Sequence, residues 1–174
     1  MARILSDSDL LNGSFMNVAI EAIENILRDR AAGQTISPPR HHISFPGRGD
    51  LIFTVEGALG EKPLAGFRVY ETFEGAEHSQ IVAVWCADDG RLKGLILGER
   101  LGAIRTGAIG GVAIRHLSSP DASVVGVLGS GLQARSQLEA AVAVRKISSA
   151  RVYSRDEPGE AFSRGKWKRT WELR

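Results

Sequence analysis

The chain has 174 residues and a formal net charge of +2, from 22 Lys and Arg against 20 Asp and Glu, so its overall charge does not point to a nucleic-acid partner. Hydrophobic residues make up 43% and charged residues 24%, which is ordinary for a soluble globular protein, and no apolar run approaches the ~20 residues needed to cross a bilayer. The single cysteine, Cys86, excludes an intramolecular disulfide and a multi-cysteine zinc site, so we expect a reduced, cytoplasmic protein without a membrane partner.

The first part of the chain predicts a short strand over residues 3–5 and then a long helix. The helix is expected from about residue 14 to residue 32, because apolar side chains recur there at three- and four-residue steps. Gly33 follows it, at a place where a left-handed cap needs no Cβ. Pro38 and Pro39 then predict an extended stretch, because a residue that precedes proline avoids the helical region.

The middle of the chain changes to strand-like segments and predicts a largely antiparallel sheet. Asp88-Asp89-Gly90 between the last two segments is a hairpin signal, because glycine tolerates positive φ. A helix rich in Gly and Ala follows, from about residue 99 to residue 117. The strands are expected at 41–45, 51–55, 64–70, 80–86 and 92–97.

The last third predicts a β-α-β unit. Val124–Leu128 is a continuous apolar run, typical of a strand buried on both faces. A Gly-rich turn, a helix over 133–144 and a second strand over 151–154 follow it. With only two strands after residue 117, one flank of the apolar run is expected to be exposed.

The residues after 154 show no apolar periodicity. Gly165–Trp171 is basic and contains two tryptophans, a composition shared by stacking platforms for single-stranded nucleic acid. No surrounding fold supports such a platform, so we expect an unstructured tail and no nucleic-acid partner.

The Gly-rich turn fits the dinucleotide fingerprint G-x-G-x-x-[G/A]. Gly129 would make the tight turn, Gly131 would let a pyrophosphate approach the backbone, and Ala134 would allow close helix packing. The preceding strand and following helix strengthen the match, since the helix N-terminus would face the phosphates. A strand-helix turn without a ligand is the alternative.

The end of the second strand bears on the choice between NAD and NADP. An acidic residue there holds the ribose 2′-hydroxyl of NAD, whereas an arginine accommodates a 2′-phosphate. This chain has Ser154 and Arg155, which favours NADP. Arg155 could equally be a solvated loop residue.

Two segments together resemble the ornithine cyclodeaminase/mu-crystallin family. Leu101–Ala108 reads LGAIRTGA and Val125–Ala134 reads VGVLGSGLQA, and the resemblance runs from about residue 3 to residue 163. Three further segments are similar to that family: Ile4–Asp7, Pro39–Arg40 and Val152–Arg155.

The resemblance implies an α/β protein in two parts. Residues 1–117 would form an α+β substrate-binding and dimerisation domain with a largely antiparallel sheet, and residues 118–163 an incomplete Rossmann-like NAD(P)-binding domain. Residues 164–174 would be a basic tail outside the family pattern. The implied activity is hydride transfer at the α-carbon of a small amino acid or imine, as in conversion of ornithine to proline with ammonia release. A homodimer is also implied.

The resemblance carries roles onto three arginines. Arg40 and Arg105 match arginines that bind the substrate carboxylate, which suits the guanidinium fork. A surface residue after the two prolines is the alternative for Arg40. Arg68 stands at the position of the family's catalytic lysine, but an arginine cannot deprotonate and could there bind an anion.

The resemblance also assigns cofactor contacts to the helix that carries Arg105, to the Gly-rich turn and to the end of the second strand. These are Thr106, Gly129, Gly131, Leu132, Gln133, Ala134, Ser154 and Arg155.

The histidines do not define a metal site. His41 and His42 have no third ligand at metal spacing, so no metal site is expected. His78 lies in a loop and could approach the pocket, although a solvated position is the alternative.

The family's later strands have no counterpart here, so we expect a truncated or frameshifted member. A catalytically inactive ligand-binding protein, or a fragment without function, is therefore the alternative to the enzyme.

Overall fold

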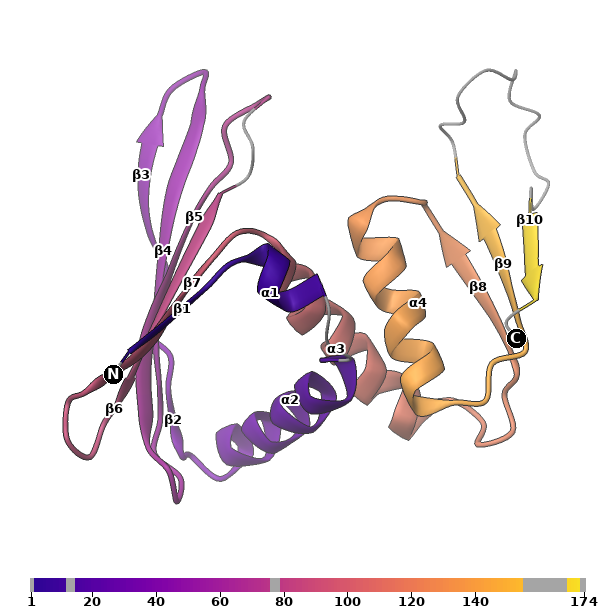
Figure 1. The fold of residues 1–174 in the computed structure, drawn as a ribbon, viewed down its shortest axis with the longest axis horizontal. Coiled ribbons are helices and arrows are strands. Elements are labelled where there is room, and N and C mark those ends of the chain that lie inside the picture. The colour runs from indigo at the N-terminus through magenta and orange to yellow at the C-terminus, as the bar shows by residue number, and fades with distance from the viewer. Residues whose placement is uncertain (1, 12–14, 76–78, 155–168, 173–174) are drawn as a thin grey trace. The chain divides into compact units, whose positions relative to one another are not determined.

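The computed structural model describes residues 2–11, 15–75, 79–154 and 169–172, and its fold is mixed α/β. The chain divides into two compact units, one formed by Met1–Gly13 with Asn25–Leu101 and the other by Ser14–Glu24 with Gly102–Arg174 (Figure 1). The helices are α1 (Asp7–Leu11), α2 (Met16–Ala31), α3 (Arg100–Leu117) and α4 (Leu132–Val144).

The first unit contains a mostly antiparallel sheet, as the sequence predicts. Its strands are β1 (Arg3–Leu5), β2 (Thr35–Ile36), β3 (His41–Phe45), β4 (Gly49–Ala58), β5 (Leu64–Glu71), β6 (Gln80–Cys86) and β7 (Leu92–Leu97). The hydrogen-bonded order is β1-β7-β6-β5-β4-β2, and β3 also pairs with β4. The pairs are antiparallel apart from β1 with β7. β4 extends beyond the expected residues 51–55 at both ends, and β2 was not expected at all.

The first residues of α3 belong to the first unit and are capped by a side chain from near the N-terminus of the chain. The Asp7 carboxylate accepts hydrogen bonds from the backbone N–H groups of Glu99, at 3.1 Å, and Arg100, at 3.0 Å. Gly98, which precedes them, has a φ of +112°, and a Cβ there would overlap the same carboxylate. The glycine is thus required both by its backbone conformation and by the cap.

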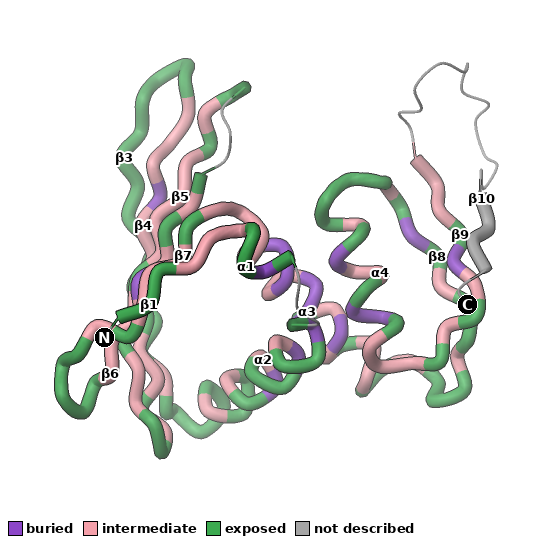
Figure 2. The backbone as a smooth tube through the Cα atoms, viewed as in Figure 1, coloured by how far each residue is buried: buried purple, intermediate pink, exposed green. Residues whose placement is uncertain are grey.

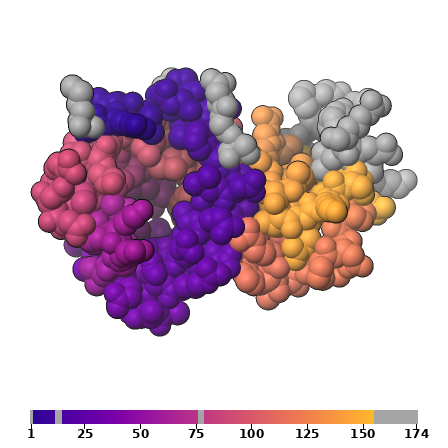
Figure 3. Space-filling view, turned by 60° about the horizontal axis from the view of Figure 1, so that its bottom comes forward, coloured from indigo at the N-terminus to yellow at the C-terminus, as the bar shows by residue number. Residues whose placement is uncertain are grey.

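The second unit contains a three-stranded sheet whose parallel part is the expected β-α-β unit. Its strands are β8 (Val124–Leu128), β9 (Ser149–Tyr153) and β10 (Arg169–Glu172). β8 and β9 are parallel and are joined by α4, which lies against β8. Figure 3 shows the atoms of this part of the chain coloured from salmon to orange.

β10 corrects two expectations from the sequence. It pairs antiparallel with β9, so the sheet has three strands and not two, and residues 169–172 are not an unstructured tail. The periodicity of side chains could not reveal this strand, because its pairing is made by backbone groups with a strand some twenty residues away. Residues 155–168 lie outside the described part of the chain.

Small residues on α3 form the core of the second unit. A Cβ on Gly107 would lie 2.6 Å from the backbone oxygen of Ser136 on α4, and one on Gly111 would lie 2.7 Å from Cδ1 of Ile20 on α2. Ile20 is fully buried. Figure 2 shows buried residues on all three of these helices. The Gly- and Ala-rich composition of α3 is therefore explained by close helix packing.

A buried carboxylate also holds the second unit together. Glu24, only 7% exposed, accepts hydrogen bonds from Nη1 of Arg115 at 2.6 Å and contacts Nε2 of His116 at 3.0 Å. Nη2 of Arg115 lies 2.9 Å from the exposed carboxylate of Glu21. The hydrogen bond that Arg115 donates to Glu24 is the main cause that raises the pKa of Arg115. The Arg115 guanidinium therefore links α3 to α2 through two carboxylates.

The C-terminal end of α3 is capped by the side chain of Arg145. The Arg145 guanidinium, just after α4, donates to carbonyl groups in and after the last turn of α3, where a helix runs out of backbone N–H donors. Its acceptors are the backbone oxygens of Ile114, Arg115, Ser118, Ser119 and Val144 and the hydroxyl of Ser118.

Candidate functional site

The Gly-rich turn connects β8 to α4 as the fingerprint predicts. Gly129 has a φ of +99°, which favours glycine, and its N–H donates to the carbonyl of Tyr153 at the end of β9, 2.6 Å away. This hydrogen bond fixes the start of the turn at the carboxyl edge of the two parallel strands. Ligands of open α/β sheets bind at that edge.

The N-terminus of α4 is open to an anion. Gly131 is the N-cap and has no side chain to bond the first turn, so the N–H groups there lack a capping side chain. Its φ is −75°, and a Cβ built on it would meet nothing within 4 Å. The backbone therefore leaves free space directly before a helix N-terminus, which fits the pyrophosphate of a dinucleotide.

Two hydroxyl groups join the loops that follow β8 and β9. Oγ of Ser130 lies 2.9 Å from Oγ of Ser154, within hydrogen-bond distance. Ser154 thus stands beside the Gly-rich turn, and no acidic residue takes its place at the end of β9. Arg155, which the sequence assigns to a 2′-phosphate, lies outside the described residues.

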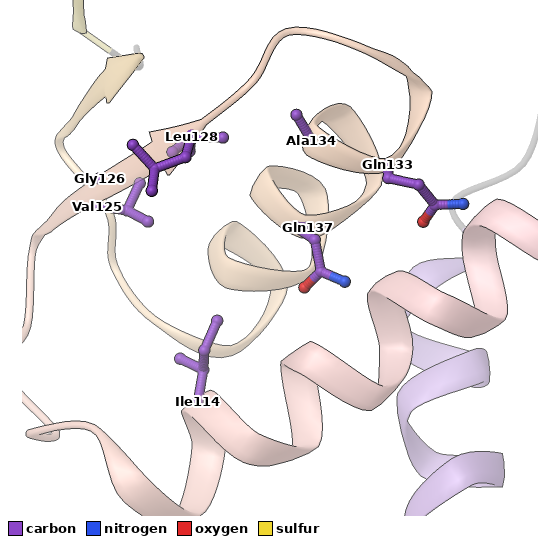
Figure 4. Close-up of a pocket in the computed structure, with 8 residues that line it drawn as sticks. Ile114, Val125, Gly126, Leu128, Gln133, Ala134 and Gln137 are labelled. Atoms are coloured by element: carbon purple, nitrogen blue, oxygen red, sulfur yellow. The ribbon is translucent and has the colours of Figure 1, made fainter. Parts of the chain in front are cut away.

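A cavity of about 330 Å³ lies between α4 and β8, behind the Gly-rich turn. Figure 4 shows Ile114 of α3 pointing toward this space and Gln137 of α4 pointing toward α3. The lining is largely apolar and is formed by Ile114, Val125, Gly126, Val127, Leu128, Gln133, Ala134 and Gln137. Leu128, which lines this space, is 77% exposed.

Arg105 and Thr106 lie in the first half of α3. Arg105 is half-buried, and among the described residues no hydrogen bond or ion pair involves its guanidinium. The Thr106 hydroxyl donates to the carbonyl of Gly102 at 2.7 Å, one helical turn back. The Thr106 carbonyl accepts a hydrogen bond from the side-chain amide of Gln137 on α4, at 3.1 Å. The helix with Arg105 is thus bonded directly to the helix that begins at the Gly-rich turn.

In the first unit, Arg40 and Arg68 converge on one tyrosine. Nη1 of Arg40, just before β3, donates to the hydroxyl oxygen of Tyr70 at 3.4 Å. Cζ of Arg68 lies 4.1 Å from the centre of the Tyr70 ring, a cation–π contact. Arg68 and Tyr70 are two apart on β5 and so share one face of the sheet.

The structure therefore brings some of the sequence-predicted residues together within each unit. Arg40 and Arg68 share Tyr70 in the first unit, and Ser154 meets the Gly-rich turn in the second. His78 lies outside the described residues. Sequence reasoning missed Tyr70 and Gln137. The two-residue alternation of β5 was a signal for Tyr70, whereas the amide of Gln137 gave none.

No group of three or more His, Cys, Asp and Glu side chains among the described residues is arranged to hold a metal ion. No helix in the same residues has both the length and the apolar character needed to span a membrane.

The ornithine cyclodeaminase/mu-crystallin family matches residues 2–169. The chain belongs to this family. A Δ1-pyrroline-2-carboxylate reductase of Bacillus cereus is 31% identical over 167 residues, which are 92% of this chain and 51% of that protein. Relatives in the family thus include NAD(P)-dependent reductases, dehydrogenases and cyclodeaminases that act on amino acids or their imines.

Solved structures of family members have the same fold. The Thermococcus litoralis Δ1-pyrroline-2-carboxylate reductase in complex with NADH and L-proline has a TM-score of 0.78 and 28% identity, covering 88% of this chain and 50% of that one. An archaeal alanine dehydrogenase dimer with bound NAD has a TM-score of 0.76 and 27% identity, covering 88% and 48%. The chain spans about half the length of the curated relatives and solved structures that it matches.

Proposed function

We propose that the chain is an NAD(P)-dependent oxidoreductase of the ornithine cyclodeaminase/mu-crystallin family, acting on a small amino acid or a cyclic imino acid. The observation that carries the proposal is the open N-terminus of α4, where Gly131 leaves space that a Cβ would fill. A bound nicotinamide dinucleotide would supply or take up a hydride at the α-carbon of the substrate. The conversion of ornithine to proline with ammonia release and the reduction of a cyclic imine are both forms of this chemistry.

The residues of the second unit would hold the dinucleotide. Gly129 shapes the turn, and the N–H groups of Leu132, Gln133 and Ala134 at the start of α4 would bind the pyrophosphate. Thr106 on α3 is also proposed to contact the dinucleotide, because α3 is hydrogen-bonded to α4 at this residue. Apart from Thr106, these residues lie in the proposed dinucleotide-binding domain, residues 118–163, whereas residues 1–117 are the proposed substrate-binding and dimerisation domain.

The arginines would bind the substrate carboxylate. Arg40 and Arg68 lie on one face of the first unit's sheet, and Arg105 has a guanidinium without a partner among the described residues. The Arg105 guanidinium, a permanent cation, is therefore suited to an anionic ligand. Arg40 and Arg105 are each proposed as carboxylate-binding residues, and Arg68 would add positive charge beside Tyr70.

NADP is the proposed cofactor in preference to NAD. The support is that Ser154, at the end of β9, offers a hydroxyl where an acidic side chain would repel a 2′-phosphate. Serine can donate a hydrogen bond to phosphate, which a carboxylate cannot. Titration of the chain with NADPH and NADH separately tests this preference, and tighter binding of NADH would contradict it.

A homodimer is proposed through the sheet of the first unit. Its face opposite Arg68 and Tyr70 carries five apolar side chains that are at least a third exposed, and an exposed apolar patch often marks an interface. They are Ile43, Val55, Phe67, Ile81 and Leu97. Light scattering should give a dimer for the wild-type chain and a monomer for Phe67→Glu, whereas a wild-type monomer would contradict the proposal.

The function is tested by following NADPH and NADH consumption with Δ1-pyrroline-2-carboxylate, and their formation with ornithine, proline and alanine. The wild-type chain should turn over at least one of these substrates. Arg105→Ala should lower kcat/KM at least ~100-fold, since a charge-assisted bidentate contact is lost. The matched control, Arg48→Ala, removes an exposed arginine from a turn and should retain wild-type turnover. Wild-type turnover by Arg105→Ala would contradict the assignment.

Ligand binding without turnover is the second candidate, and Arg68 is the observation that favours it. A guanidinium stays protonated, so Arg68 cannot relay the proton that this chemistry requires. Under this alternative, calorimetry should detect saturable binding of an imino acid while no dinucleotide is consumed. Any confirmed product would exclude it.

A further inference from the structure

Tyr70 lies between two guanidinium groups on one face of the first unit's sheet. Arg40 reaches the phenolic oxygen at 3.4 Å, and Arg68 covers the ring at 4.1 Å from its centre. Both cations hold their protons at every physiological pH. Tyr70 is therefore the member of this group of three that can exchange a proton.

The hydrogen bond with Arg40 leaves the proton of Tyr70 available. Arg40 is the donor in that contact, so the phenolic oxygen accepts and its own O–H can donate to a third group. Within the described residues, no protein acceptor for this O–H is found. In the sheet register Tyr70 is flanked by Ile52 on β4 and Gln80 on β6, neither of which is an acid or a base.

The proposed reduction of a cyclic imine needs a proton as well as two electrons. The imine nitrogen must become an iminium, because a neutral imine is a poor acceptor of a hydride. Neither Arg40 nor Arg68 can release that proton. The phenolic O–H of Tyr70, half-buried and within reach of Arg40 and Arg68, is a group that can release one, and the Arg40 N–H already directed at the oxygen can continue to donate to it after the proton leaves.

We propose that the Tyr70 hydroxyl is the acid that protonates the substrate nitrogen, a role that rests on the proposed function. The O–H bond of Tyr70 breaks, its electron pair stays on the phenolate oxygen, and the imine lone pair forms the new N–H bond. A reduced nicotinamide dinucleotide, when bound, would supply the hydride, with both its electrons, to the iminium carbon. A proton from the solvent would return to the phenolate, so that one imine, one reduced dinucleotide and one proton give the amine and the oxidised dinucleotide.

The test compares two substrates that differ in their need for a proton. Δ1-pyrroline-2-carboxylate must be protonated before reduction, whereas its N-methyl iminium analogue already carries the positive charge. Tyr70→Phe keeps the ring under Arg68 and removes only the hydroxyl. We expect this variant to lose kcat on the neutral imine by ~100-fold or more, as is typical when a general acid is removed, and to reduce the N-methyl iminium at the wild-type rate.

A binding measurement separates this role from a structural one. Pyrrole-2-carboxylate has the ring and the carboxylate but cannot be reduced, and its affinity for wild-type and Tyr70→Phe is measured by calorimetry. We expect the two dissociation constants to agree within about threefold, because the carboxylate contacts of the arginines remain. Equal losses on both substrates, or a large loss of affinity, would show that Tyr70 only positions the arginines and would overturn the proposal.

The outcomes also separate this proposal from the function on which it rests. If the wild-type chain reduces neither substrate, the proposed reductase function is wrong and the role of Tyr70 is wrong with it. If the wild-type chain and Tyr70→Phe reduce both substrates at equal rates, the function holds and only the role of Tyr70 is wrong.

Discussion

The side-chain amide of Gln137 donates a hydrogen bond to the backbone carbonyl of Thr106, 3.1 Å away. This contact bonds α4, whose N-terminus is the proposed phosphate site, to α3 one residue beyond Arg105. A Cβ on Gly110 would overlap the Gln137 amide, so glycine makes room for the contact. The helix that carries an arginine of the proposed substrate site is thus fixed to the helix of the proposed dinucleotide site.

Gly107→Ala should destabilise the second unit. The added Cβ would lie 2.6 Å from the backbone oxygen of Ser136, which cannot move without shifting α4. We expect the free energy of unfolding in urea to fall by about 1–3 kcal/mol, as in other overpacked cores. Gly131→Ala is the matched control, because its Cβ meets nothing within 4 Å. Equal unfolding midpoints for wild type and Gly107→Ala would contradict the close packing.

Replacing Glu24 by glutamine should cost more stability than the same change at Glu21. Glu24 is buried and accepts a hydrogen bond from Arg115 at 2.6 Å, whereas the Glu21 side chain is 62% exposed. We expect Glu24→Gln to lower the free energy of unfolding by about 1–3 kcal/mol and Glu21→Gln by less than about 0.5 kcal/mol. The two values come from parallel urea titrations. A Glu21→Gln loss as large as that of Glu24→Gln would show that burial is not the cause.

Acid should weaken the fold partly through Asp9. The Ser6 backbone N–H and hydroxyl donate to the Asp9 carboxylate at 2.7 and 2.8 Å and lower its pKa from 3.8. Because the folded-state pKa is the lower one, this stabilisation is complete above pH 3.8 and is lost as the pH falls through the lowered value.

The pH dependence is measured as urea unfolding midpoints between about pH 5 and pH 2. The wild-type midpoint should fall over this range, and Asp9→Asn should show a shallower fall, since the amide does not titrate. The difference will be small because the carboxylate is exposed. A steeper fall for Asp9→Asn than for the wild type would contradict the assignment.

The sequence predicted the elements whose hydrogen bonds are local or whose side chains alternate. The strand 124–128, the Gly-rich turn and the following helix were found because an apolar run, a positive-φ glycine and a helix start leave distinct residue patterns. The interpretation of this run as a strand buried on both faces was wrong, because Val127 is the buried residue of β8 while Val124 and Leu128 are exposed. β2 and β10 were missed. A two-residue strand has no measurable alternation, and β10 is specified by its backbone pairing with β9.

The candidate site was harder to predict than the fold. The roles of Arg40, Arg68 and Arg105 came from resemblance, because a single arginine in a sequence does not show what it faces. The contact of Tyr70 with two of these arginines depends on the register of β5 and on the approach of a loop some thirty residues earlier. Such non-local contacts leave no spacing that a sequence pattern could show.

The central claim, that the N-terminus of α4 binds a dinucleotide, is tested most directly by calorimetric titration of wild type and Gly131→Ala with NADPH. The variant should keep the wild-type unfolding midpoint, since a φ of −75° suits alanine and its Cβ meets nothing within 4 Å. That Cβ would fill the space of the pyrophosphate. We predict saturable binding to the wild-type chain and affinity at least ~10-fold weaker for Gly131→Ala. Equal affinity for the two, or no binding to the wild-type chain, would contradict the account.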